Sequence, residues 1–146
     1  MYRILLAIDG SEHSKKVVDE ARRIAEAMNA EVTVFNVVNL DDVSPRISVH
    51  MSDDYWDLIK KNLKSDGEKI VEKAAETLRG DGLAVKTEIL IGPQSPADAI
   101  CEKAKKDRYD LVVIGSRGVR GIKEAFLGSV SNKVAHCAGI NVLIIK

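Results

Sequence analysis

The sequence has no net charge and no long apolar run, and each shortage excludes a class of protein. Lys and Arg together number 22, as do Asp and Glu, so the formal net charge at pH 7 is zero. A balanced chain lacks the broad positive field that attracts nucleic acid or anionic lipid. The N-terminal apolar run, Ile4 to Ile8, is also far too short for a secretion signal or a membrane span. We therefore expect no nucleic-acid partner and no membrane partner.

Cysteine is scarce as well. Cys101 and Cys137 both fall in stretches with helical patterning. Two thiols in 146 residues do not make the disulfide framework of a small secreted domain. We interpret both as small apolar helix residues, because no neighbouring pattern marks either as a nucleophile. The presence of two cysteines without a disulfide framework predicts a reducing, cytoplasmic location.

Familiar catalytic and metal-binding motifs are missing. His13, His50 and His136 lie far apart and have no Cys or carboxylate at ligand spacing, so no metal site built from protein side chains is expected. No glycine is followed by Lys-Ser or Lys-Thr at the spacing of a Walker loop, and there is no G-x-G-x-x-G. The usual kinase and dehydrogenase interpretations therefore lose their main support.

Apolar runs and helical patterns alternate along the chain. Short runs rich in β-branched residues predict five strands: Ile4 to Ile8, Val32 to Val38, Val85 to Ile91, Leu111 to Ile114, and Val142 to Ile145. Helical spacing predicts four helices, which are a Ser11-capped helix ending at Asn29, Tyr55 to Leu78, a Ser95-capped helix through Ala104, and Val130 to Ala138. Turn formers make Leu40 to Asp54 a long connection.

This alternation predicts one doubly wound α/β domain over residues 1–146. Right-handed crossovers give a five-stranded parallel sheet with helices on both faces, and we expect the strand order 3-2-1-4-5. Ligands of such sheets bind beyond the carboxyl ends of the strands, where the strand order reverses. The site should gather Asp9, the end of the second strand and the loop after Ile114.

Glycines mark that loop. Gly115 and Gly118 are followed, after nine residues, by Gly128, with Ser129 and Ser131 close behind. Glycine lets main-chain N–H groups turn toward phosphate oxygens, and a helix N-terminus favours an anion. The alternative is that these glycines only make a tight strand-to-helix turn.

The glycine pattern resembles the nucleotide-binding signature of the universal stress protein family. The segment ILLAIDGSEHS resembles that family's first strand and the acidic turn after it. The segments DLVVIGSRG and FLGSVSNKVAH together resemble its phosphate loop, and NVLIIK resembles its last strand. The resemblance implies an adenine nucleotide, ATP or else ADP or AMP, and a homodimer through Val142 to Ile145. Mg²⁺ or Mn²⁺ would be carried by the phosphates, with Ser129 as a contact.

The expected nucleotide-binding residues lie around the turn after the first strand, at the end of the second strand and in the glycine loop. Asp9 would accept hydrogen bonds from the ribose or adenine, although its position also suits a plain turn former or helix cap. Arg117, with Arg120 and Lys123, would screen phosphate charge, although solvated loop cations are common. The full set is Ala7, Ile8, Asp9, Val37, Ile114, Gly115, Arg117, Gly118, Gly128, Ser129, Val130 and Ser131.

Three functions compete at this stage. The leading hypothesis is a nucleotide-dependent switch in a stress response, in which a partner recognises the surface that ATP orders. A slow ATPase or self-phosphorylating enzyme is the second, but Glu124 is the one candidate base in the glycine loop, and we assign no catalytic residue. The third is a scaffold dimer that needs no nucleotide.

Overall fold

The sheet has the predicted order and direction. The computed structural model describes residues 1–43, 52–118 and 127–146. Its five strands are ordered β3-β2-β1-β4-β5, and every neighbouring pair is parallel. Their bounds are β1 Arg3–Ala7, β2 Glu31–Asn39, β3 Ala84–Gly92, β4 Leu111–Gly115 and β5 Asn141–Ile145. The strand order 3-2-1-4-5 is therefore confirmed.

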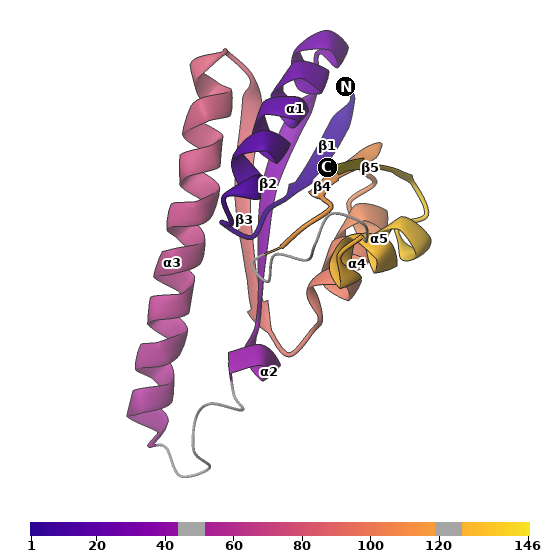
Figure 1. Ribbon diagram of the computed structural model, residues 1–146. Helices are drawn as coiled ribbons and strands as arrows, with labels where there is room; N and C mark the ends of the chain where they lie inside the picture. Colours follow the sequence, from indigo (N-terminus) through magenta and orange to yellow (C-terminus); the bar gives the residue numbers. More distant parts are fainter. Residues whose placement is uncertain (44–51, 119–126) are drawn as a thin grey trace.

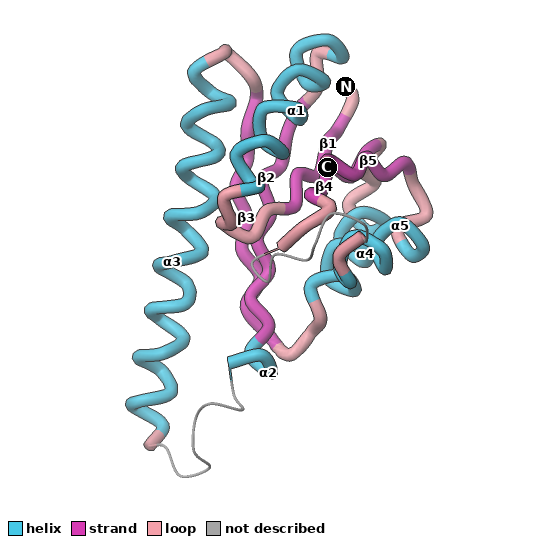
Figure 2. Tube along the Cα trace, in the orientation of Figure 1, coloured by secondary structure: helices cyan, strands magenta, loops and turns pink. Residues whose placement is uncertain are grey.

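Helices cover both faces of this sheet, as Figures 1 and 2 show. The helices α1 and α3 pack on one face, and α4 and α5 pack on the other. Their bounds are α1 His13–Met28, α2 Leu40–Val43, α3 Asp53–Gly80, α4 Pro96–Lys106 and α5 Ser129–Cys137. Within the described ranges, no helix combines the length and apolarity that crossing a bilayer requires.

The predicted helix caps have different outcomes. Ser95 caps α4 as expected, because its hydroxyl accepts a hydrogen bond from the main-chain N–H of Asp98 at 3.3 Å. The predicted cap at Ser11 is wrong, since Glu12 holds that position in α1 and makes no side-chain cap. The main-chain N–H of Ser11 instead donates to Asp9 Oδ1 at 3.0 Å. Ser11 thus belongs to the turn after β1.

The connection predicted over Leu40 to Asp54 is partly helical. Its start forms α2, and its last two residues form the first turn of α3, where Ser52 is the cap. Residues 44–51 lie outside the described part of the chain. The prediction of an irregular segment is therefore wrong at both ends.

A buried asparagine ties the end of β1 to β2. Asn36 lies on β2, is almost fully buried, and donates from Nδ2 to the main-chain oxygen of Ile8 at 2.9 Å. Its Oδ1 faces α3 at Gly67, where an added Cβ would lie 3.1 Å away, and it has no hydrogen-bond partner among the described residues. Because Ile8 precedes Asp9, this amide helps to fix the turn on which the predicted site depends.

We predict that Asn36→Asp lowers the free energy of unfolding by about 3 kcal/mol or more at pH 7, because an ionised carboxylate is buried and cannot donate to Ile8. Urea denaturation measures this difference. Asn39→Asp is the matched control, since the Asn39 Oδ1 acceptor for the Asp41 amide is retained. Equal stabilities of the two variants would contradict the role assigned to Asn36.

Candidate functional site

The parallel sheet brings the carboxyl ends of β1, β2 and β4 together. In the register, Ala7 of β1 lies beside Phe35 on one side and Ile114 on the other. The chain continues from these positions into Asp9, Val37 and the loop after Gly115. Segments that are more than a hundred residues apart in sequence therefore meet at one edge, as the topology predicts.

The predicted apolar site residues lie on opposite faces of the sheet. Ala7 and Ile114 are buried in the cluster under α4 and α5, and Val37 packs against the same cluster. Ile8 instead belongs to the cluster under α1 and α3. Side chains alternate along a strand, so Ile8 can contribute only its main chain to a ligand on the α4 and α5 side.

The main chain of Ser116 joins three segments directly after β4. Its N–H donates to the carbonyl of Ile145 at 2.7 Å, and its own carbonyl accepts from the N–H of Gly128 at 2.8 Å. The Ile145 carbonyl also lies 2.8 Å from Nε2 of His13. These bonds hold the first glycine turn, the end of β5 and the start of α5 in a fixed relation.

At each described glycine of the loop, an added Cβ would lie in close contact with a neighbouring atom. A Cβ at Gly115 would lie 2.8 Å from Cδ2 of His13, and one at Gly128 would lie 3.1 Å from the carbonyl oxygen of Ser116. A Cβ at Gly118 would lie 3.0 Å from Oδ2 of Asp9. The last distance shows that the loop after β4 reaches the acidic turn after β1.

Asp9 is held by its own turn. Its Oδ1 accepts from the main-chain N–H of Ser11 at 3.0 Å and from the hydroxyl of Ser14 at 3.1 Å. These two bonds orient the carboxylate, and its Oδ2 lies beside Gly118. Asp9 is therefore a turn former, one of the alternatives that the sequence left open, and it also faces the glycine loop.

Gly128 begins α5 without a side-chain cap. The first N–H groups of a helix have no partner within it, so those of Ser129 and Val130 can serve an anion. Ser129 is exposed, but Ser131 is buried and its hydroxyl donates to the Gly128 carbonyl at 3.0 Å. The two serines predicted to bind phosphate thus differ, and Ser129 offers the accessible hydroxyl.

The rest of the predicted set is placed as follows. Arg117 is exposed directly after Ser116, whereas Arg120, Lys123 and Glu124 lie outside the described residues. Two shallow hollows lie elsewhere, beside β3 against α3 and against α4, the first of about 410 Å³. Between residues 1–43, 52–118 and 127–146, no three His, Cys, Asp or Glu side chains cluster as metal ligands.

Sequence reasoning missed the supporting residues of this site. Ser116 and His13 support the site through main-chain and ring hydrogen bonds to residues far away in sequence. No pattern in the sequence predicts such contacts. Asn36 did carry a signal, because it is a polar interruption in the apolar run of β2. A polar residue inside a buried strand predicts a specific hydrogen bond.

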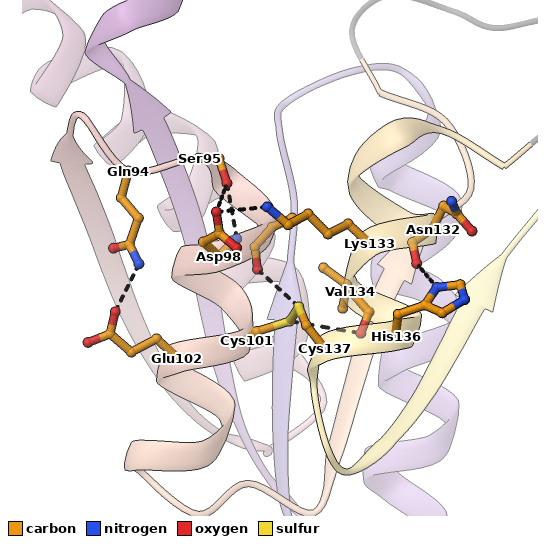
Figure 3. The surroundings of a disulfide bond; sticks show 11 residues. Gln94, Ser95, Asp98, Cys101, Glu102, Asn132, Lys133, Val134, His136 and Cys137 are labelled. Atoms are coloured by element: carbon orange, nitrogen blue, oxygen red, sulfur yellow. Dashed lines mark hydrogen bonds and ion pairs between the residues drawn. A yellow bond between two sulfur atoms is a disulfide. The ribbon is translucent and has the colours of Figure 1, made fainter.

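The interpretation of the cysteines as separate apolar residues is wrong. Cys101 and Cys137 form a disulfide, with their Cα atoms 5.8 Å apart (Figure 3). The two crossovers place α4 and α5 side by side on one face, so residues 36 positions apart come within bonding distance. A disulfide is uncommon in a reducing cytosol, so cysteine usage no longer supports the predicted location, which stays a prediction.

Known proteins are similar to this chain in sequence and in fold over most of their lengths. The model of the universal stress protein family matches residues 1–146. Universal stress protein YxiE of Bacillus subtilis is 35% identical over 147 residues, covering 99% of this chain and 98% of the relative.

Solved structures agree with these sequence matches. The structure of protein MJ0577 superposes with a TM-score of 0.85 at 23% identity, covering 99% of this chain and 95% of that one. A universal stress protein family protein from Arabidopsis thaliana with AMP bound superposes with a TM-score of 0.70 at 19% identity, covering 100% and 92%. From its sequence matches along the whole length, supported by this fold, the chain belongs to the universal stress protein family.

Proposed function

We propose that this chain binds an adenine nucleotide at the carboxyl edge of β1, β2 and β4 and acts as a nucleotide-dependent switch in a stress response. The approach of Gly118 to Asp9 carries the proposal, because it brings a carboxylate acceptor and a glycine loop to one place. The AMP bound to the Arabidopsis relative supports this choice of ligand.

The geometry favours one orientation of the nucleotide. Phosphates would lie between Gly118 and the start of α5, where the first N–H groups of a helix favour an anion and no side chain at the N-cap position caps them. The ribose or base would lie toward Asp9, since a carboxylate accepts hydrogen bonds and repels phosphate. The main chain around Ala7, Val37 and Ile114 would then line the base pocket.

ATP is our preferred ligand within this class, with Mg²⁺ or Mn²⁺ carried on its phosphates. Such an ion keeps most of its waters and needs few protein ligands, and the exposed Ser129 hydroxyl is close to the expected phosphates. The proposed switch depends on the nucleotide lying between two segments of the protein. A nucleotide that contacts both the β1 turn and α5 stabilises one arrangement of the two, which a partner can recognise.

We predict that Gly118→Val weakens adenine nucleotide binding by at least tenfold, or about 1.4 kcal/mol, because the side chain occupies the space between the loop and Asp9. Titration calorimetry with ATP and AMP, with Mg²⁺ present, measures the affinity. Gly92→Val is the matched control, since a Cβ at Gly92 meets nothing within 4 Å. Unchanged affinity of the Gly118 variant would remove the loop from the site.

We predict that Asp9→Asn lowers the affinity for AMP by roughly tenfold, since a hydrogen bond to a charged acceptor contributes about 1.5–3 kcal/mol. The asparagine oxygen can still accept from Ser11 and Ser14, so the turn should persist and the far-UV circular dichroism should not change. Full affinity in the asparagine variant would show that the carboxylate does not contact the nucleotide.

We also propose a homodimer through β5. This strand forms one edge of the sheet, and its Leu143 side chain is 36% exposed. An apolar edge strand is prone to pair with another chain. In a dimer, the bond from Ser116 to Ile145 would connect the interface to the glycine loop.

Leu143→Glu should convert such a dimer to monomer, because two like charges would meet at the interface. Sedimentation velocity measures the change. Met28→Glu, on an exposed position of α1, serves as the control and should leave the oligomeric state as it is. Identical sedimentation of the wild type and both variants would exclude β5 as the interface.

A further inference from the structure

The disulfide links α4 to α5, two helices that are separated in the chain by β4 and the glycine loop. Cys101 lies on the buried face of α4 and is 5% exposed, whereas Cys137 is the half-buried last residue of α5. Figure 3 shows the bond crossing between the two helices. Reagents in solution therefore reach this pair through Cys137.

The surroundings of the pair suit both of its oxidation states. Sγ of Cys101 lies 3.9 Å from the carbonyl oxygen of Val134, and Sγ of Cys137 lies 3.9 Å from that of Ala97. These oxygens accept the S–H groups once the bond is reduced. Each thiol would then have a carbonyl acceptor nearby, so neither would be a buried donor without a partner.

Apolar packing and an ion pair also hold α5 against α4, since Val134 and Val130 share one cluster with Ile100 of α4. Within α5, the buried residues are Ser131 and Val134. Lys133 Nζ contacts Asp98 Oδ2 at 2.8 Å, and hydrogen bonds from Lys133 and Ser95 lower the pKa of Asp98. Both partners of this ion pair are about half exposed, and exposed ion pairs hold helices together weakly. The disulfide therefore adds a covalent restraint to this packing and to the hydrogen bond that holds Gly128 at Ser116.

The same helix carries the proposed phosphate site at its other end. With nine residues, α5 is about 13 Å long and moves as one rigid piece. A bond at Cys137 thus restrains the position of Gly128 and Ser129. Their N–H groups bind an anion best when they are already in place, since ordering them on binding lowers the affinity.

We propose that Cys101 and Cys137 form a reversible redox site that regulates the nucleotide site: the disulfide raises the affinity for adenine nucleotide by fixing α5, and reduction lowers it. This inference rests on the proposed function. Through the cysteine pair, the redox state of the surroundings would change the fraction of the protein that has nucleotide bound.

The oxidant is a low-molecular-weight disulfide. The Cys137 thiolate attacks one of its sulfurs, forms a mixed disulfide and releases one thiolate. The Cys101 thiolate then attacks the Cys137 sulfur and releases the second. The protein pair loses two electrons and two protons, and the small disulfide becomes two thiols.

The test compares AMP affinity by calorimetry in protein oxidised with glutathione disulfide and in protein reduced with dithiothreitol. Thiol titration establishes each state, and circular dichroism confirms that the fold is retained. Cys137→Ser is the control, because it cannot form the bond and should bind equally under both conditions. Cys137→Ala replaces it if the serine variant does not fold.

We expect reduction to weaken AMP binding by about fivefold, at the low end of typical couplings between sites. Both conditions of the Cys137 variant should then match the reduced wild type. Amide hydrogen exchange at Ser129 to Ser131 should also become faster on reduction. Equal affinities of the oxidised and reduced wild type would overturn the inference and leave the proposed function intact. Absence of binding in both states would remove the proposed function, and this regulation with it.

Discussion

The hydrogen bonds of one main-chain unit, Ser116, hold the candidate site together. Its N–H is bonded to the end of β5 and its carbonyl to Gly128 at the start of α5. A parallel sheet brings strand ends to one edge, but it does not by itself orient the loops that leave them. Ser116 supplies that orientation, because it lies in the glycine turn and its carbonyl accepts a hydrogen bond from Gly128 at the helix N-terminus. The proposed phosphate site, the edge strand β5 and the disulfide-linked helix all connect through this residue.

Most of the fold could be predicted from the sequence because it follows from patterns over many residues. Continuous apolar runs identified four strands, and the alternation in Val85 to Ile91 correctly indicated a strand at the edge of the sheet. Ser95 followed by Pro96 gave the start of α4. The same reasoning failed at Ser11, since the helix starts one residue later than predicted, with Glu12 at the N-cap, and Ser11 belongs to the Asp9 turn. A capping residue type alone does not fix the residue at which a helix starts.

The candidate site was only partly predictable, since it depends on contacts between distant segments. The glycine spacing located the loop, but it could not show that Gly118 approaches Asp9 or that Ser131 turns its hydroxyl back into α5. Ile8 was included for its place in sequence, although alternation along β1 directs its side chain to the opposite face. The cysteine pair was missed for the same reason, since its partners meet only after two crossovers have formed.

The central claim is that an adenine nucleotide lies between the β1 turn and the start of α5. Titrating isotopically labelled protein with AMP, while recording amide chemical shifts, tests it most directly. The account predicts saturable shifts at Ser11, Gly118, Gly128, Ser129 and Val130, with little change along α3. Saturable shifts confined to the hollow beside β3, around Glu68 and Ile89, would contradict this placement. No shift at any amide would contradict nucleotide binding itself.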